Sequence, residues 1–164
     1  LMQTTGIVRK IDELGRIVLP KELRKYLNIN PGDDFQINIE DQKIILEKYS
    51  RLSNIKTELI DIVNIFQNIT NYKIYLIINN EISNLNNEKI KNKIQNIIQE
   101  RKLYINESNE ISISQNIIEK GKIVINPIIY NSDILGTIIV VGDNTSNIIN
   151  TSKLLSEIIK MKFM

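Results

Sequence analysis

Hydrophobic residues recur along the first fifty residues with the spacing of short strands around one brief helix. Phe35, Ile37 and Ile39 alternate with polar neighbours, which is the period of a strand with one buried face. Leu23 and Leu27 are four residues apart, so they share one side of a helix that begins near a proline. In chain order, the pattern predicts strands at 4–11 and 16–19, a helix at 20–27, strands at 35–39 and 43–49, and turns at 12–15, 31–32 and 41–42.

This N-terminal segment has little capacity to bury apolar surface by itself. Four short strands and a two-turn helix form too small a core for a stable monomer. The alternating strands also leave apolar faces that need a partner. We therefore expect residues 1–50 to form an obligate dimer in which hairpins of two chains interleave.

The stretch 50–70 has apolar residues spaced alternately by three and four positions. These residues are Leu52, Ile55, Leu59, Ile62, Phe66 and Ile69. Such spacing is typical of a coiled-coil seam, and it fits equally an amphipathic helix that packs on the sheet of its own domain. The sequence predicts a helix here and leaves both packing partners open.

The remainder of the chain mixes strongly apolar runs with helical patterns. It predicts strands at 73–79, 121–130 and 134–142, a weak strand at 111–114, helices at 87–102 and 147–163, and a hairpin turn at 131–133. The whole chain is thus expected to be an α+β protein. We divide it into a domain at 1–50, a linking or dimerisation helix at 51–70, and a second domain at 71–164.

Composition narrows the functional classes. The chain has 164 residues and a formal net charge of +2, and it contains neither cysteine nor histidine. Thiolate and histidine catalysis and zinc-cysteine sites are therefore excluded, and we expect a non-enzymatic protein with no catalytic residues, no cofactor and no metal site. No apolar run approaches the about 20 residues of a membrane span, so we expect a cytoplasmic protein with no membrane partner.

Charge is sorted along the first fifty residues. Residues 1–27 carry six basic and three acidic side chains, whereas 28–50 carry two basic and five acidic ones. A basic face of this kind attracts phosphate, and arginine forks fit phosphate oxygens and guanine edges. The alternative is a solvated surface in which the basic groups pair with nearby acids. The candidate nucleic-acid-binding residues are Arg9, Lys10, Arg16, Lys21, Arg24 and Lys25.

The motifs TGIVRKIDELGRIVLPKELRKYLNI, PGD and IEDQKIILEKY follow one another over 4–49. In this order they resemble the N-terminal DNA-binding domain of AbrB-type transition-state regulators. The resemblance implies a swapped-hairpin barrel, a dimer through residues 1–50, and double-stranded DNA as the partner. It places the family's DNA-contacting arginines on Arg9, Arg16 and Arg24. In the family a further arginine is common at the position of Lys25. This chain therefore keeps the positive charge there but loses the guanidinium group.

The arrangement of the whole chain is similar to SpoVT-like sporulation regulators, which follow this domain with a GAF-like domain. The stretch NPIIYNSDILG at 126–136 carries the resemblance, while 82–88 is shortened. It implies a nucleoid-associated transcription regulator of sporulation or transition-state genes. The resemblance leaves open whether the protein forms a tetramer through the helix at 52–69 and the C-terminal domain. It also leaves open an unknown small-molecule ligand. The alternative is an antitoxin of the same fold that neutralises a toxin partner.

Overall fold

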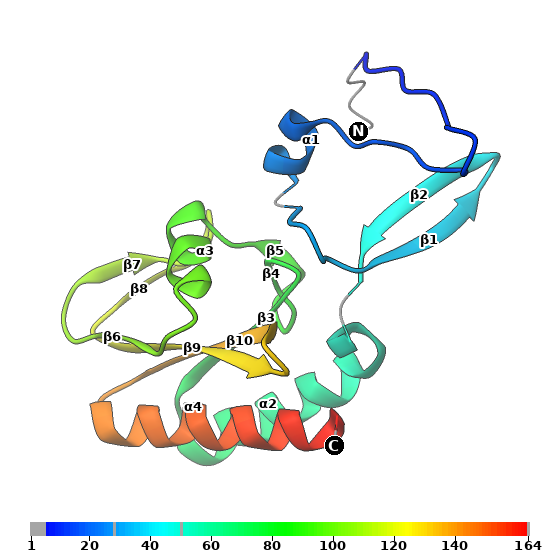
Figure 1. Cartoon of the computed structure of the whole chain (residues 1–164). Coiled ribbons are helices and arrows are strands. Elements are labelled where there is room, and N and C mark those ends of the chain that lie inside the picture. The colour runs from blue at the N-terminus through cyan, green and yellow to red at the C-terminus, as the bar shows by residue number, and fades with distance from the viewer. Residues whose placement is uncertain (1–5, 28, 50, 164) are drawn as a thin grey trace. The chain divides into compact units, whose positions relative to one another are not determined.

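The computed structural model describes residues 6–27, 29–49 and 51–163, which form two compact units (Figure 1). The first comprises residues 1–47 and the second residues 48–164. The elements of the first unit are a short helix α1 (Lys21–Tyr26) and a hairpin of β1 (Phe35–Glu40) and β2 (Lys43–Lys48). The predictions for residues 1–5, 28, 50 and 164 lie outside the described residues.

The turn predicted at 12–15 is present, but the strands on either side of it are not. The Asp12 N–H donates to the carbonyl oxygen of Arg16 at 3.0 Å, and the Gly15 N–H donates to the Asp12 carbonyl oxygen at 2.9 Å. Gly15 has φ +75°, a left-handed conformation that glycine adopts without steric cost. Between Gly6 and Leu19 the structure has no strand, because a strand needs a hydrogen-bonded neighbour and one chain does not supply it.

Helix α1 agrees with the prediction in position but not in burial. Pro20 is the N-cap residue, with ψ 149°, and not the first helical residue as predicted. Leu23 is half-buried and Leu27 is 56% exposed, so the side of α1 that they share is not buried within one chain. The β1–β2 hairpin is confirmed, and its turn residues Asp41 and Gln42 both have positive φ, as tight hairpin turns require.

The first unit lacks a hydrophobic core within one chain. Among the described residues of 6–47 none is buried. Large apolar side chains that face solvent include Val8, Ile11, Leu14, Val18, Ile37, Ile39 and Ile44. Apolar surface of this extent is uncommon on a monomeric protein and marks an interaction surface.

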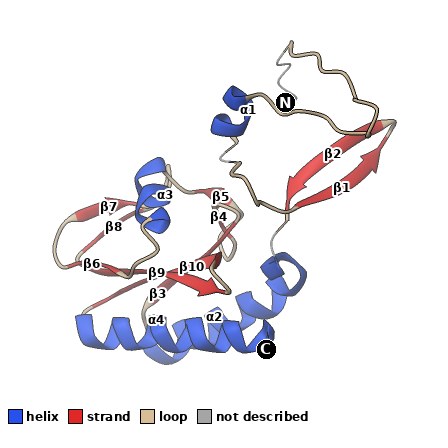
Figure 2. Ribbon diagram, in the orientation of Figure 1, coloured by secondary structure: helices blue, strands red, loops and turns tan. Residues whose placement is uncertain are grey.

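The second unit is a mixed α/β structure built on an antiparallel sheet (Figure 2). Its six strands lie in the order β5-β4-β3-β10-β9-β6, and β7 and β8 form a separate hairpin. The elements are η1 (Arg51–Ile55), α2 (Lys56–Thr70), β3 (Lys73–Ile78), β4 (Glu81–Ile82), β5 (Glu88–Lys89), α3 (Asn92–Gln99), β6 (Tyr104–Asn106), β7 (Glu110–Ser112), β8 (Ile118–Lys120), β9 (Lys122–Tyr130), β10 (Asp133–Gly142), α4 (Thr145–Lys160) and η2 (Met161–Phe163). Within the described residues, no helix has both the length and the apolar character needed to cross a membrane.

The sheet of the second unit is buried on both faces. Helices α2 and α4 cover one face, and α3 with the β7–β8 hairpin covers the other (Figure 1). In β3, Ile74 and Leu76 join the core under α2 and α4, while Tyr75 and Ile77 join the opposite core. This two-sided burial explains why β3 is a continuous apolar run and does not alternate with polar residues.

The helix predicted at 50–70 is η1 followed by α2, and it packs on its own domain. Leu52, Leu59 and Val63 are fully buried in the core beneath the sheet. The packed-helix alternative is therefore confirmed for these positions. Ile65 and Ile69 are exposed, at 54% and 75%, on the side of α2 that faces away from this core.

The other elements of the second unit match the prediction unevenly. The three long strands and the closing helix are confirmed within a few residues. The helix predicted at 87–102 is shorter, because Glu88 and Lys89 pair with β4, Ile90 forms a bridge to Ser114, and α3 then covers only Asn92–Gln99. The weak strand predicted at 111–114 is β7, while β4, β6 and β8 were missed as strands. These strands are two or three residues long, too short for periodicity to appear.

Candidate nucleic-acid interface

Asp12 organises the turn that carries Arg16. Its Oδ1 accepts the Leu14 N–H at 3.0 Å and the Arg16 N–H at 2.8 Å, and its Oδ2 accepts from Arg16 Nε at 2.8 Å. The backbone hydrogen bond from Arg16, then the one from its side chain, lowers the pKa of Asp12 below its ordinary value. The Arg16 side chain remains 70% exposed. The pairing expected under the surface-charge alternative is therefore present at Arg16, and it fixes one edge of the guanidinium.

The other predicted basic residues near this turn are exposed. Arg9 donates from Nη1 to the carbonyl oxygen of Val8 at 3.0 Å, and Lys10 is exposed beside it. In the described part of the chain, neither Glu13 nor Glu22 forms an ion pair with any of the six candidate residues. Among the described residues, Arg16 is thus the one candidate with an ion pair to an acid.

Three of the six candidates surround a hollow beside α1. Lys21, Arg24 and Lys25 occupy positions i, i+3 and i+4 of one helix, so their side chains lie on one face. Together with Ile29 and Asn30 they line a cavity of about 320 Å³. Among the described residues that line it, none is acidic.

The loop after α1 positions the far side of this hollow. The Ile29 N–H donates to the carbonyl oxygen of Arg24 at 2.7 Å, which holds Ile29 against the end of the helix. The Asn30 N–H donates to Asp33 Oδ2 at 2.7 Å, and the Asp33 N–H donates back to Asn30 O at 3.1 Å. Sequence reasoning read this segment only as a turn at Pro31-Gly32 and missed Ile29 and Asn30. Periodicity carries no signal for which way such a loop folds.

Arg24 has a buried donor with no acceptor. Its Nε is inaccessible to solvent and has no hydrogen-bond partner among the described residues. A buried donor left unsatisfied costs about 1–3 kcal/mol, so Arg24 would be stabilised by any rearrangement that brings an acceptor to this atom. The cluster of Lys21, Arg24 and Lys25 is suited to an anion with several acceptor oxygens. The structure thus places the six candidates in two groups, one at the 12–15 turn and one around the hollow.

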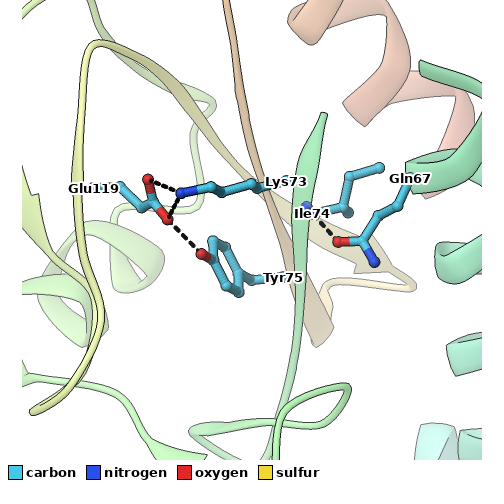
Figure 3. Close-up of polar contacts among 5 residues, drawn as sticks. All are labelled: Gln67, Lys73, Ile74, Tyr75 and Glu119. Carbon is cyan, nitrogen blue, oxygen red and sulfur yellow. Dashed lines mark hydrogen bonds and ion pairs between the residues drawn. The ribbon is translucent and has the colours of Figure 1, made fainter. Parts of the chain in front are cut away.

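A polar cluster in the second unit fastens the β7–β8 hairpin to the sheet (Figure 3). Lys73 Nζ lies 2.9 and 3.0 Å from the two carboxylate oxygens of Glu119, and the Tyr75 hydroxyl donates to Glu119 Oε1 at 2.6 Å. The Glu119 side chain is only 10% exposed. Burial, followed by the hydrogen bond to Glu119 and its negative charge, raises the pKa of Tyr75 well above its ordinary value, so Tyr75 stays a neutral donor. This cluster joins β8 to β3.

Comparison with known proteins concerns the N-terminal region. The family model described as "Antidote-toxin recognition MazE, bacterial antitoxin" matches residues 8–53. The transition state regulatory protein AbrB of Bacillus subtilis (strain 168) is 58% identical over 48 residues, which are 29% of this chain and 50% of that protein. Residues 8–53 are thus similar to the MazE/AbrB-type N-terminal domain.

Further relatives match the MazE/AbrB-type domain. Stage V sporulation protein T of the same organism is 51% identical over 55 residues, or 33% of this chain and 31% of that protein. A solved structure titled as the RDC-refined N-terminal DNA recognition domain of the Bacillus subtilis transition-state regulator AbrB is 58% identical. It covers 29% of this chain and 91% of that one, with a TM-score of 0.26. The matches to AbrB and stage V sporulation protein T span half or less of those relatives' own length.

Proposed function

We propose that this protein is a DNA-binding transcription regulator, active on sporulation or transition-state genes in the bacterial nucleoid. The observation that carries the proposal is the 58% identity to AbrB over 48 residues that hold the candidate basic residues. A solved relative of the same segment is titled a DNA recognition domain. The proposed DNA-contacting residues are Arg9, Arg16 and Arg24, supported by Lys10, Lys21 and Lys25.

The geometry indicates how this domain would read DNA. Helix α1 has only six residues and is too short to serve as a long recognition helix in the major groove. Phosphate contacts would then supply most of the affinity, and sequence preference would depend largely on DNA shape. Arg16, held at its Nε edge by Asp12, would present the rest of its guanidinium in a defined orientation.

A dimer through residues 1–50 is part of the proposal. No described residue of 6–47 is buried, which supports it, because the exposed apolar side chains would need a second chain to cover them. In a swapped-hairpin barrel the segments 6–11 and 16–19 would find strand partners in the other chain. Both segments would then form the strands that the sequence predicts.

The second unit would act as a GAF-like regulatory or oligomerisation domain. A central antiparallel sheet with helices on both faces supports the GAF-like assignment. Ile65 and Ile69 on α2 and Leu154 on α4 are exposed apolar side chains, and contacts through such residues would join two dimers into a tetramer.

The test is DNA binding by an Arg16→Ala, Arg24→Ala double variant of the intact protein, measured at several salt concentrations. Loss of four phosphate contacts per dimer would reduce the slope of log affinity against log salt by about 3.6. A Lys120→Ala, Lys153→Ala variant, which removes two exposed charges from the second unit, serves as the control. The proposal is wrong if the double variant remains dimeric and binds promoter DNA as tightly as the parent.

An antitoxin role is the second candidate, and the description of the matching family model favours it. An antitoxin of this fold would use a C-terminal tail that folds on its toxin. Residues 48–164 instead have two hydrophobic cores of their own, which favours the regulator. Purification of the protein from its native cells in a stable complex with a small nuclease would support the antitoxin.

A further inference from the structure

The hollow beside α1 has the volume of a small-molecule site. At about 320 Å³ it falls at the lower end of the range of about 300–1,000 Å³ that is usual for ligand pockets. The hollow is open to solvent, and a surface that only tracks a DNA backbone needs exposed cations but no hollow of this volume. The volume is therefore a feature that DNA binding alone does not explain.

The lining of the hollow combines two kinds of contact. Lys21, Arg24 and Lys25 supply three positive charges, and the described chain has no carboxylate paired with any of them. Ile29 supplies an apolar wall and Asn30 an amide that donates and accepts hydrogen bonds. The three cations suit a phosphate group. Ile29 and Asn30 suit a flat or apolar part attached to that phosphate.

Arg24 is the cation of this lining whose Nε has no acceptor among the described residues. This donor is buried and lacks an acceptor in the described structure, although the hollow opens beside its side chain. A phosphate oxygen at hydrogen-bond distance would satisfy it with a charge-assisted bond, which is roughly twice as strong as a neutral one. Lys21 and Lys25 lie one turn apart and would share the remaining charge.

We propose that this hollow binds a free phosphorylated small molecule of nucleotide size, with its phosphate on Arg24 and its organic part against Ile29 and Asn30. The inference rests on the proposed function in one respect: Arg24 is also a proposed DNA contact. The ligand and DNA therefore exclude each other at Arg24, and the ligand lowers the fraction of regulator bound to DNA. At ten times its dissociation constant, the ligand raises the apparent Kd for DNA about eleven-fold.

The experiment follows the Arg24 Nε–Hε resonance of the full-length protein by NMR. The probes are inorganic phosphate and adenosine 5′-monophosphate, each titrated at an ionic strength held constant with chloride. We expect a saturable shift of this resonance with both probes and tighter binding of the nucleotide. Asn30→Ala weakens binding of the nucleotide several-fold and leaves binding of inorganic phosphate unchanged. Lys153→Gln, outside the hollow, leaves both unchanged.

A parallel assay measures DNA binding with and without adenosine 5′-monophosphate at the same ionic strength. The expected result is weaker DNA binding by the parent, while an Arg24→Lys variant, whose dimeric state is checked by light scattering, no longer responds. The inference is overturned if neither probe gives a saturable shift. A shift of the resonance with DNA but with neither probe would assign the hollow to the DNA backbone. Failure of the parent to bind DNA at low salt would contradict the proposed function, while a probe shift would still support the site.

Discussion

Asn84 closes part of the edge of β3 with its side chain. Strand β4 pairs with β3 only at Ile77 and Ile78, so the backbone before them has no strand neighbour on that side. The amide of Asn84 takes that place, since its Oδ1 accepts the Leu76 N–H at 2.9 Å and its Nδ2 donates to the Ile74 carbonyl oxygen at 2.8 Å. One side chain thus satisfies two backbone groups next to fully buried residues.

Replacement of Asn84 by alanine leaves both backbone groups without a partner. Each unsatisfied buried group costs about 1–3 kcal/mol, and Asn84 is half-buried, so water reaches part of the vacated space. We therefore expect Asn84→Ala to lower the free energy of unfolding of the second unit by about 2–4 kcal/mol. The assay is urea unfolding of the full-length protein followed by circular dichroism, with the exposed Asn96→Ala on α3 as control.

A second measurement separates this mechanism from a general loss of stability. Hydrogen exchange at the Leu76 amide accelerates in Asn84→Ala more than exchange at the Ile139 amide in the centre of the sheet. Equal unfolding midpoints for Asn84→Ala and Asn96→Ala would refute the reasoning. So would equal acceleration at both amides.

Three further predictions concern the second unit. Gly136→Ala places a Cβ 2.7 Å from Leu52 Cδ1 and 2.8 Å from the Ile77 carbonyl oxygen. We therefore expect the free energy of unfolding to fall by about 1–3 kcal/mol and the Tm to fall with it. An unchanged Tm would contradict this expectation. Tyr75→Phe removes the hydrogen bond to Glu119 and should lower the free energy of unfolding by about 1.5–3 kcal/mol. Tyr104 is only half-buried, so Tyr104→Phe should lower it less in the same urea titration. Hydrogen bonds from Ser114 and then Asn116 lower the pKa of Glu88, so its stabilising contribution is complete above its unfolded-state pKa and is lost as pH falls through the folded-state pKa. Hydrogen exchange around Ser114 should therefore accelerate in acid in the parent, while in Glu88→Gln it should be insensitive to pH once intrinsic exchange is corrected for.

The candidate interface was partly accessible from sequence. The basic residues stand out by charge, and the resemblance of 4–49 ordered them by role. Ile29, Asn30 and the hollow do not stand out in the sequence. They depend on the hydrogen bond from the Ile29 N–H to the Arg24 carbonyl oxygen and on those between Asn30 and Asp33, which close the loop after α1. The ion pair between Asp12 and Arg16 was foreseen only as a general alternative for all the basic residues.

By itself, the sequence determined the order of the long elements and how little apolar surface the first fifty residues can bury alone. Both follow from quantities that add up along the chain, namely hydrophobic period and the apolar surface available for burial. Tertiary structure alone decided which face of α2 is buried and where α3 begins. It also decided that short strands such as β8 form, since Glu119 on β8 bonds to Lys73 and Tyr75, more than forty residues away. Such contacts join residues whose separation in sequence carries no periodic signal, so only the folded chain brings them together.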